Sequence, residues 1–217
     1  MNHYLRNNHI YLWLYKITQK ADFISEDEIA CSQNFTHNRL IEYRSSRNAL
    51  RKSLSEIYSV KPSSIKISAK PGESPVLLEK KEFVSISHTK GVVLIGWSKN
   101  RIGIDIEINS AKRNTSKVFK KIFSEYEIQK MQLRYKKSFN KLFLEGWTAK
   151  ESAIKWLRIK ENNKINDWQW NYSNNSIFNI PRKINLDIFK LQYKEFIISV
   201  SYKSKFPRSS IMLCSEL

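Results

Sequence analysis

Hydrophobic positions along the chain follow two periods, which predict two kinds of element. Alternating or continuous apolar runs are typical of strands; they fall at 9–16, 83–88, 92–98, 102–108, 186–192 and 195–203. Apolar residues at helical spacing predict helices at 36–58, 116–122, 124–136 and 138–159. This rhythm of a helix with several strands occurs twice, with a seam near Asn100. We therefore expect an α+β fold of two similar lobes, residues 1–100 and 101–217, each with a long helix packed on a small antiparallel sheet.

Two short segments carry the signature of a capping box, in which a serine and a glutamate three residues later satisfy each other's backbone amides. Ser25 with Glu28 predicts the start of a short helix. Ser124 with Glu127 predicts the start of the helix over 124–136. For Glu127 the sequence by itself favours this capping role.

Composition adds a strong positive charge to the picture. The 217 residues include 38 Lys and Arg against 20 Asp and Glu, a formal net charge of +18. Such a charge attracts polyanions and acidic proteins. A nucleic-acid-binding protein is one interpretation, and a protein that binds a phosphorylated cofactor and an acidic partner is another.

Cysteine usage and hydropathy bear on the compartment. Cys31 and Cys214 lie at opposite ends of the chain and form neither a disulfide framework nor a zinc motif. The apolar stretch Ile10–Tyr15 is too short to span a membrane. We expect a cytoplasmic protein without a membrane segment.

The strand over 102–108 combines four isoleucines with two acids in strict alternation. Because strand side chains point to opposite faces with period two, Gly103, Asp105 and Glu107 share one face. The two carboxylates lie roughly 6 to 7 Å apart there. Paired hard oxygen ligands suit Mg²⁺, which takes one or two carboxylates plus phosphate oxygens. A half-buried strand with a solvated polar face fits the same pattern.

The helix over 138–159 places an unusual charge in its apolar stripe. Lys150 lies near the middle of that stripe, where an ammonium is costly to bury. Glu151 and Lys155 lie together on its flank, one turn apart. Lys150 could instead extend its ammonium to solvent, and Glu151 with Lys155 could be an ordinary surface pair.

Together these segments resemble the 4′-phosphopantetheinyl transferase superfamily, in particular its larger, monomeric class of the surfactin-synthetase-activating type. The resemblance rests on Gly-Ile-Asp-Ile-Glu at 103–107 and Trp-Thr-Ala-Lys-Glu-Ser at 147–152. Phe-Ser-Glu-Tyr-Glu at 123–127, Ile-Ser-His-Thr at 86–89 and Ala-Lys-Pro at 69–71 are similar to further family segments. It implies two similar α/β lobes with coenzyme A between them, and the metal and catalytic residues in the lobe over 101–217.

The resemblance also implies roles for single residues. Asp105, Glu107 and Glu151 would hold Mg²⁺, with Glu127 near the metal, while Lys155 would contact phosphate and assist the leaving group. Glu151, directly or through a water, would be the base for the carrier serine. Residues that would bind the phosphates of coenzyme A are Arg44, Ser45, Lys70, Ser87, His88 and Lys155. Its pattern alone favours an ordinary histidine at a strand end over a phosphate donor for His88.

The implied reaction is transfer of 4′-phosphopantetheine from coenzyme A to a serine of an acidic apo carrier protein, which releases adenosine 3′,5′-bisphosphate. The chain departs from the family where a basic cluster often precedes Arg44, because residues 29–35 contain no Lys or Arg. A magnesium-dependent nuclease and a basic nucleic-acid-binding protein are the alternatives. The nuclease gives no reason for the positions of Trp147, Lys150 and His88. Nucleic-acid binding does not explain why two acids share one strand face, so we expect no nucleic-acid partner.

Overall fold

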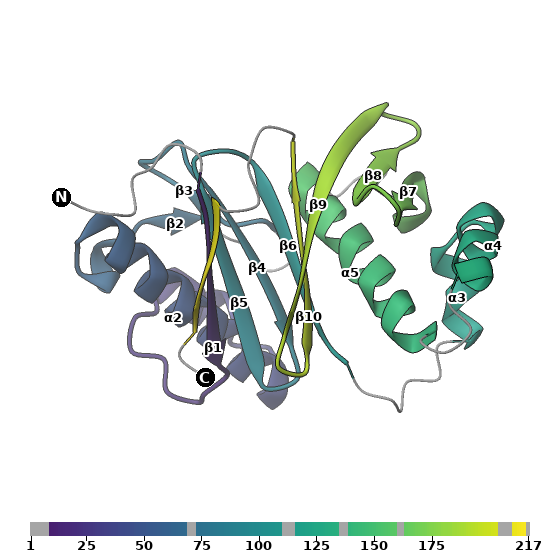
Figure 1. Cartoon of the computed structure of the whole chain (residues 1–217). Helices are drawn as coiled ribbons and strands as arrows, with labels where there is room; N and C mark the ends of the chain where they lie inside the picture. Colours follow the sequence, from purple (N-terminus) through teal and green to yellow (C-terminus); the bar gives the residue numbers. More distant parts are fainter. Residues whose placement is uncertain are drawn as a thin grey trace. The chain divides into compact units, whose positions relative to one another are not determined.

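The computed structural model describes residues 9–68, 73–109, 116–134, 139–159, 163–203 and 210–215 (Figure 1). Its helices and sheets confirm the α+β class predicted from the sequence. The chain divides into two compact units. The first comprises Met1–Ile102 with Phe206–Leu217, and the second comprises Gly103–Lys205. The similarity of two lobes stays a prediction.

The first unit is built on a four-stranded sheet with strand order β11-β1-β5-β4. Its strands are β1 (Ile10–Lys16), β4 (Phe83–Thr89), β5 (Val92–Ser98) and β11 (Ile211–Ser215), and a separate small sheet pairs β2 (Ile67–Ser68) with β3 (Val76–Leu77). Its helices are α1 (Glu26–Cys31), α2 (His37–Tyr58) and the 3₁₀ turn η2 (Pro62–Ser64). The core joins alternate residues of β1, Tyr11, Trp13 and Tyr15, to Leu50 and Leu54 of α2.

This first sheet differs from expectation in one respect. β1 pairs antiparallel with β5 but parallel with β11, so the sheet is mixed and not purely antiparallel. The sequence indicated no strand at 211–215 and assigned those residues to the C-terminal lobe. In the structure they pair with Ile10–Leu14 of the first unit.

The second unit places helices beside a five-stranded sheet with strand order β6-β10-β9-β8-β7. The strands are β6 (Ile102–Ile108), β7 (Trp168–Asn171), β8 (Ser176–Asn179), β9 (Ile184–Tyr193) and β10 (Phe196–Tyr202). The helices are α3 (Ser116–Ile122), α4 (Glu125–Arg134), α5 (Phe139–Leu157) and the 3₁₀ turn η3 (Ile165–Asp167). The predicted closing hairpin is confirmed, since β9 and β10 pair antiparallel over 187–202.

The apolar face of α5 forms the centre of the second core. Leu142, Phe143 and Ala153 pack there with Trp168 and Ile188 from the sheet. No helix in the described ranges is both long and apolar enough to cross a membrane.

Gly103 fixes how closely β6 approaches α5. A Cβ at this position would collide with the carbonyl oxygen of Ser152 and the amide nitrogen of Trp156, and would lie 2.9 Å from the Cα of Trp156. Only a residue without a side chain permits this contact of strand backbone with helix backbone. The two residues that follow Gly103 in alternation, Asp105 and Glu107, are thereby held beside the same helix.

Candidate functional site

The carboxylate of Asp105 meets the ammonium of Lys155 across the contact between β6 and α5. Lys155 Nζ lies 2.7 Å from Asp105 Oδ1 and donates a hydrogen bond to it. The Asp105 side chain is 8% exposed and that of Lys155 is 28% exposed. For Asp105, the interpretation of a solvated strand face is therefore wrong, because the carboxylate is buried and paired.

Glu151 lies in the electrostatic field of this pair. Burial raises the pKa of Glu151 above its ordinary value, and the negative charges of Asp105 and Glu107 raise it further. The Lys155 ammonium acts in the opposite direction. Three carboxylates from β6 and α5 thus interact with one another, and Lys155 is a cation among them.

Trp147 of α5 holds the carboxylate of Glu107 on β6. Its indole Nε1 donates a hydrogen bond to Glu107 Oε1 at 3.2 Å. The ring stacks on Phe143, with an angle of 13° between the ring planes. Because the ring is held by the core, the indole N–H fixes the direction of the Glu107 carboxylate.

Lys150 is completely buried and does not extend to solvent. Its ammonium donates to the carbonyl oxygen of Ile122 at 2.7 Å and to Glu127 Oε2 at 2.9 Å, and it lies 4.9 Å from the centre of the Phe123 ring. Burial lowers the pKa of Lys150, and the charge of Glu127 opposes that effect. The lysine in the apolar stripe is therefore one half of an internal ion pair between α5 and the start of α4.

The carboxylate of Glu127 receives four hydrogen bonds from the protein. Oε2 accepts from the amide and the hydroxyl of Ser124 and from Lys150, and Oε1 accepts from the amide of Trp170. Glu127 N donates to Ser124 Oγ, which completes the predicted capping box. This side chain connects α4, α5 and β7, while no interaction with Asp105, Glu107 or Glu151 is found for it in the described structure.

Pairs of hydroxyls hold α5 against β10, a feature that the sequence did not indicate. Thr148 Oγ1 lies 2.8 Å from Ser199 Oγ, and Ser152 Oγ lies 2.7 Å from Ser201 Oγ. All four side chains are buried. Because each small hydroxyl finds a partner, the helix approaches the strand closely without an unsatisfied polar group.

The donor set of Asp105, Glu107 and Glu151 suits a hard divalent cation. Carboxylate oxygens are the ligands of Mg²⁺, which also retains oxygen ligands from waters or a bound phosphate. The pKa of Glu151 is raised mainly by burial and in addition by repulsion from Asp105 and Glu107, and a cation bound there would relieve that repulsion. Within the described residues, no three His, Cys, Asp or Glu side chains are already gathered around one point as ligands.

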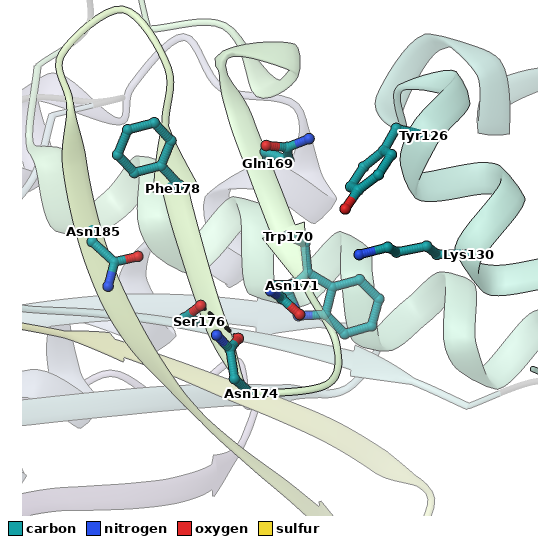
Figure 2. Close-up of a pocket in the computed structure, with 9 residues that line it drawn as sticks. All are labelled: Tyr126, Lys130, Gln169, Trp170, Asn171, Asn174, Ser176, Phe178 and Asn185. Carbon is teal, nitrogen blue, oxygen red and sulfur yellow. Dashed lines mark hydrogen bonds between the residues drawn. The ribbon is translucent and has the colours of Figure 1, made fainter.

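A surface pocket of about 290 Å³ lies beside α4, and none of these acids is among its lining residues (Figure 2). Tyr126 and Lys130 of α4 face Trp170 of β7 across it. Carboxamides dominate the rest of the lining, which consists of Gln169, Asn171, Asn174, Ser176, Phe178 and Asn185. None of the residues predicted to form a site lines this pocket.

The predicted phosphate-binding residues of the first unit stand on α2 and β4. Arg44 Nε donates to Ser32 Oγ at 3.3 Å, and Ser45 Oγ accepts from the amide of Thr18 at 3.2 Å. Ser87 is buried and His88 is exposed on β4. Lys70 falls outside the described residues.

His88 has a neighbour that the sequence did not single out. Arg39 Nη1 lies 3.4 Å from His88 Nε2 and 3.7 Å from Glu42 Oε2. The two predicted residues Ser45 and Ser87, being buried, are less accessible to a ligand than Arg39 and His88.

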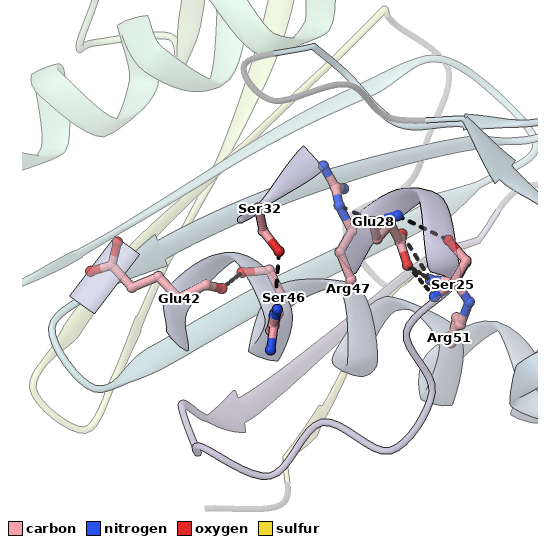
Figure 3. Close-up of polar contacts among 8 residues, drawn as sticks. Ser25, Glu28, Ser32, Glu42, Ser46, Arg47 and Arg51 are labelled. Atoms are coloured by element: carbon pink, nitrogen blue, oxygen red, sulfur yellow. Dashed lines mark hydrogen bonds and ion pairs between the residues drawn. The ribbon is translucent and has the colours of Figure 1, made fainter. Parts of the chain in front are cut away.

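Two further arginines of α2 are bound by an acid of α1 (Figure 3). Arg51 Nη1 donates to both carboxylate oxygens of Glu28, at 2.9 and 2.6 Å, and Arg47 Nε lies 3.8 Å from Glu28 Oε1. Glu28 also caps α1 with Ser25, as predicted. Glu28, Arg47 and Arg51 are all buried, so this cluster fastens α1 to α2.

Comparisons with known proteins point to one family. Residues 101–201, which carry all of the acids and lysines described above for the second unit, match the model of the 4′-phosphopantetheinyl transferase superfamily. A stretch of 113 residues is 29% identical to a protein of Synechocystis sp. that carries a provisional name as a 4′-phosphopantetheinyl transferase. That alignment covers 50% of this chain and 46% of the relative, so the chain spans about half the length of the relative that it matches. Both findings support the 4′-phosphopantetheinyl transferase superfamily for this chain.

Proposed function

We propose that this chain transfers 4′-phosphopantetheine from coenzyme A to a serine of an acidic apo carrier protein, as a monomer of the surfactin-synthetase-activating class. The observation that carries the proposal is the meeting of Asp105 with Lys155 beside Glu151 and Glu107, within the segment that matches the superfamily. The reaction needs cationic groups beside the pyrophosphate and a base beside the serine, and these residues supply both. The matches lend no support to a nuclease or a nucleic-acid-binding protein.

In this reaction the serine Oγ forms a bond to the β-phosphorus of coenzyme A, and the bond from that phosphorus to the bridging oxygen breaks. Glu151, directly or through a water, accepts the serine proton, and the burial that raises its pKa makes it a stronger base. The leaving group is adenosine 3′,5′-bisphosphate, and Lys155 stabilises its developing negative charge. A divalent cation held by Asp105, Glu107 and Glu151 would supply neutralisation of the pyrophosphate.

The contacts of Glu127 modify one part of the predicted ligand set. Its two oxygens serve Ser124, Lys150 and the amide of Trp170, so we assign to Glu127 the positioning of α4 against α5. For the first unit, we propose that Arg44 and His88 bind phosphate groups of coenzyme A, with Lys70, Ser45 and Ser87 as the other predicted contacts.

The deciding experiment is the intact mass of an apo acyl carrier protein after incubation with this protein, coenzyme A and Mg²⁺. We expect a gain of one phosphopantetheine that disappears when the metal is chelated. An alanine variant of the carrier serine is the matched control and should gain nothing. If several apo carriers of different pathways all keep their mass, while the protein is folded by circular dichroism, the proposed function is wrong.

A further inference from the structure

Three carboxylates of the second unit, those of Asp105, Glu107 and Glu151, lie in the electrostatic field of Lys155. Asp105, Glu107 and Glu151 together bring three carboxylates, and Lys155 brings one ammonium. Asp105 and Glu107 both disfavour ionisation of Glu151, and Lys155 favours it. Like charges that share a partly buried site repel each other unless a cation lies between them.

Lys155 is bound, but it is not enclosed. Its ammonium makes a short contact of 2.7 Å with a largely buried Asp105, whereas 28% of its own side chain is exposed. A lysine ammonium is a compact charge on a flexible four-carbon stem, and it can change partners without a movement of the backbone. Lys150, on the same helix, lacks this freedom because it is fully buried and holds two acceptors.

We propose that Lys155 is an exchangeable counterion: it neutralises Asp105 while no divalent cation is bound, and it leaves Asp105 for the phosphate groups of the substrate when one binds. This proposal rests on the proposed function for the identity of the substrate phosphates. Its first half concerns the protein alone. The charge of Lys155 keeps the carboxylates compatible before the cation arrives, and the same charge then becomes available to the pyrophosphate.

The exchange has a consequence that separates it from an ordinary surface ion pair. A bound divalent cation and the Lys155 ammonium repel each other and compete for Asp105. Removal of the lysine charge should therefore strengthen binding of the cation in the absence of coenzyme A. A lysine that only decorates the helix surface would leave that affinity unchanged.

The test is a titration of the full chain with Mn²⁺ in the absence of coenzyme A and carrier. Binding is monitored by calorimetry and by the electron paramagnetic resonance signal of free Mn²⁺. We expect K155M to bind Mn²⁺ about tenfold more tightly than the wild-type protein. K155R, which keeps the charge, should bind like the wild type. K190M is the matched control, because Lys190 also pairs with an acid of this unit, Glu145, at 3.2 Å.

Two further arms keep the proposal open to refutation. In the wild-type chain, acetylation of Lys155 by limiting acetic anhydride, mapped by mass spectrometry, should become faster when Mg²⁺ is added, while that of Lys190 stays constant. In the D105N background, addition of K155M should no longer change the affinity for Mn²⁺, because the carboxylate for which the lysine and the cation compete is gone. Equal or weaker binding of Mn²⁺ by a folded K155M, including no binding by either protein, overturns the exchange, whatever the carrier assay shows. Tighter binding by K155M combined with no transfer to any carrier supports the exchange and refutes only the proposed function.

Discussion

Helix α5 carries two lysines that lie in opposite environments. Lys150 is buried and donates to Glu127 and to the carbonyl oxygen of Ile122. Lys155 is partly exposed and meets Asp105, and two further carboxylates, those of Glu107 and Glu151, interact with this pair. Five residues along a helix rotate a side chain by about 140° from its starting direction, so the two ammonium groups point to different sides. The first pair is a closed internal contact, and the second is a charged group suited to a ligand.

The largest expected effect is loss of transfer when one of the carboxylates around Lys155 is removed. Asp105→Ala and Glu151→Ala should each lower the rate of transfer by about three orders of magnitude or more, because each removes a carboxylate from the proposed cation site. Melting curves should change little. Rates are measured by carrier mass at several times. Glu145→Ala, on the same helix but paired with Lys190, is the control and should keep its rate.

Disruption of the buried pair of Lys150 with Glu127 should instead lower the stability of the protein. Lys150→Met leaves the Glu127 carboxylate buried without its cation, which should cost about 3 to 5 kcal/mol of the free energy of unfolding. The double variant Lys150→Met with Glu127→Gln should recover part of that loss, because the stranded charge is gone. Urea denaturation gives both values. Lys155→Met, measured alongside, should lose clearly less stability, because the Lys155 side chain is 28% exposed and solvent screens this pair; a loss as large as that of Lys150→Met would remove the distinction between the two lysines.

Gly103 tests whether the contact of β6 with α5 positions the acids. Gly103→Ala forces a methyl group onto the backbone of Ser152 and Trp156, so it should cost about 1 to 3 kcal/mol and also lower the rate of transfer. Thermal melting and the carrier assay measure the two effects. Gly91→Ala is the comparison, since its φ of 81° is strained for alanine but its Cβ would meet open space. That variant should lose stability alone.

The smallest expected effect concerns the indole of Trp147. Trp147→Phe keeps an aromatic ring against Phe143 but removes the donor to Glu107 Oε1, which should weaken Mn²⁺ binding and transfer by about tenfold. Trp156→Phe on the same helix serves as a control, and transfer by that variant should be nearly unchanged. If Trp147→Phe binds the cation normally, its indole does not orient Glu107.

Local patterns in the sequence predicted the helix caps, helices and hairpins, because these depend on residues that are close in sequence. The capping boxes at Ser25 and Ser124, the helix α2 and the β9–β10 hairpin all follow from nearby side chains, and the structure confirms them. The alternation over 102–108 placed Asp105 and Glu107 on one face, and the sequence identified Lys150 as an ammonium in an apolar stripe.

Features that depend on distant segments were not accessible in the same way. The partner of Lys150 is 23 residues away, and the sequence presented Glu127 as a helix cap and as a residue near the metal, not as the partner of Lys150. The hydroxyl pairs between α5 and β10 join residues about 50 positions apart, and Ser199 and Ser201 look like ordinary strand residues. β11 is five residues long and pairs with a strand at the opposite end of the sequence, so no local signal distinguishes it.

The pairing of β11 with β1 makes the order of synthesis matter. All residues of the second unit lie between the two parts of the first, so the second is complete when residue 205 has been made and the first is not. Until residues 211–215 leave the ribosome, one edge of β1, with Leu12, Trp13 and Leu14, has no neighbouring strand. Unpaired apolar edges promote aggregation, and domains generally fold as units during synthesis. The nascent chain therefore depends on β11 to protect β1, and loss of residues 211–215 should appear as aggregation during expression.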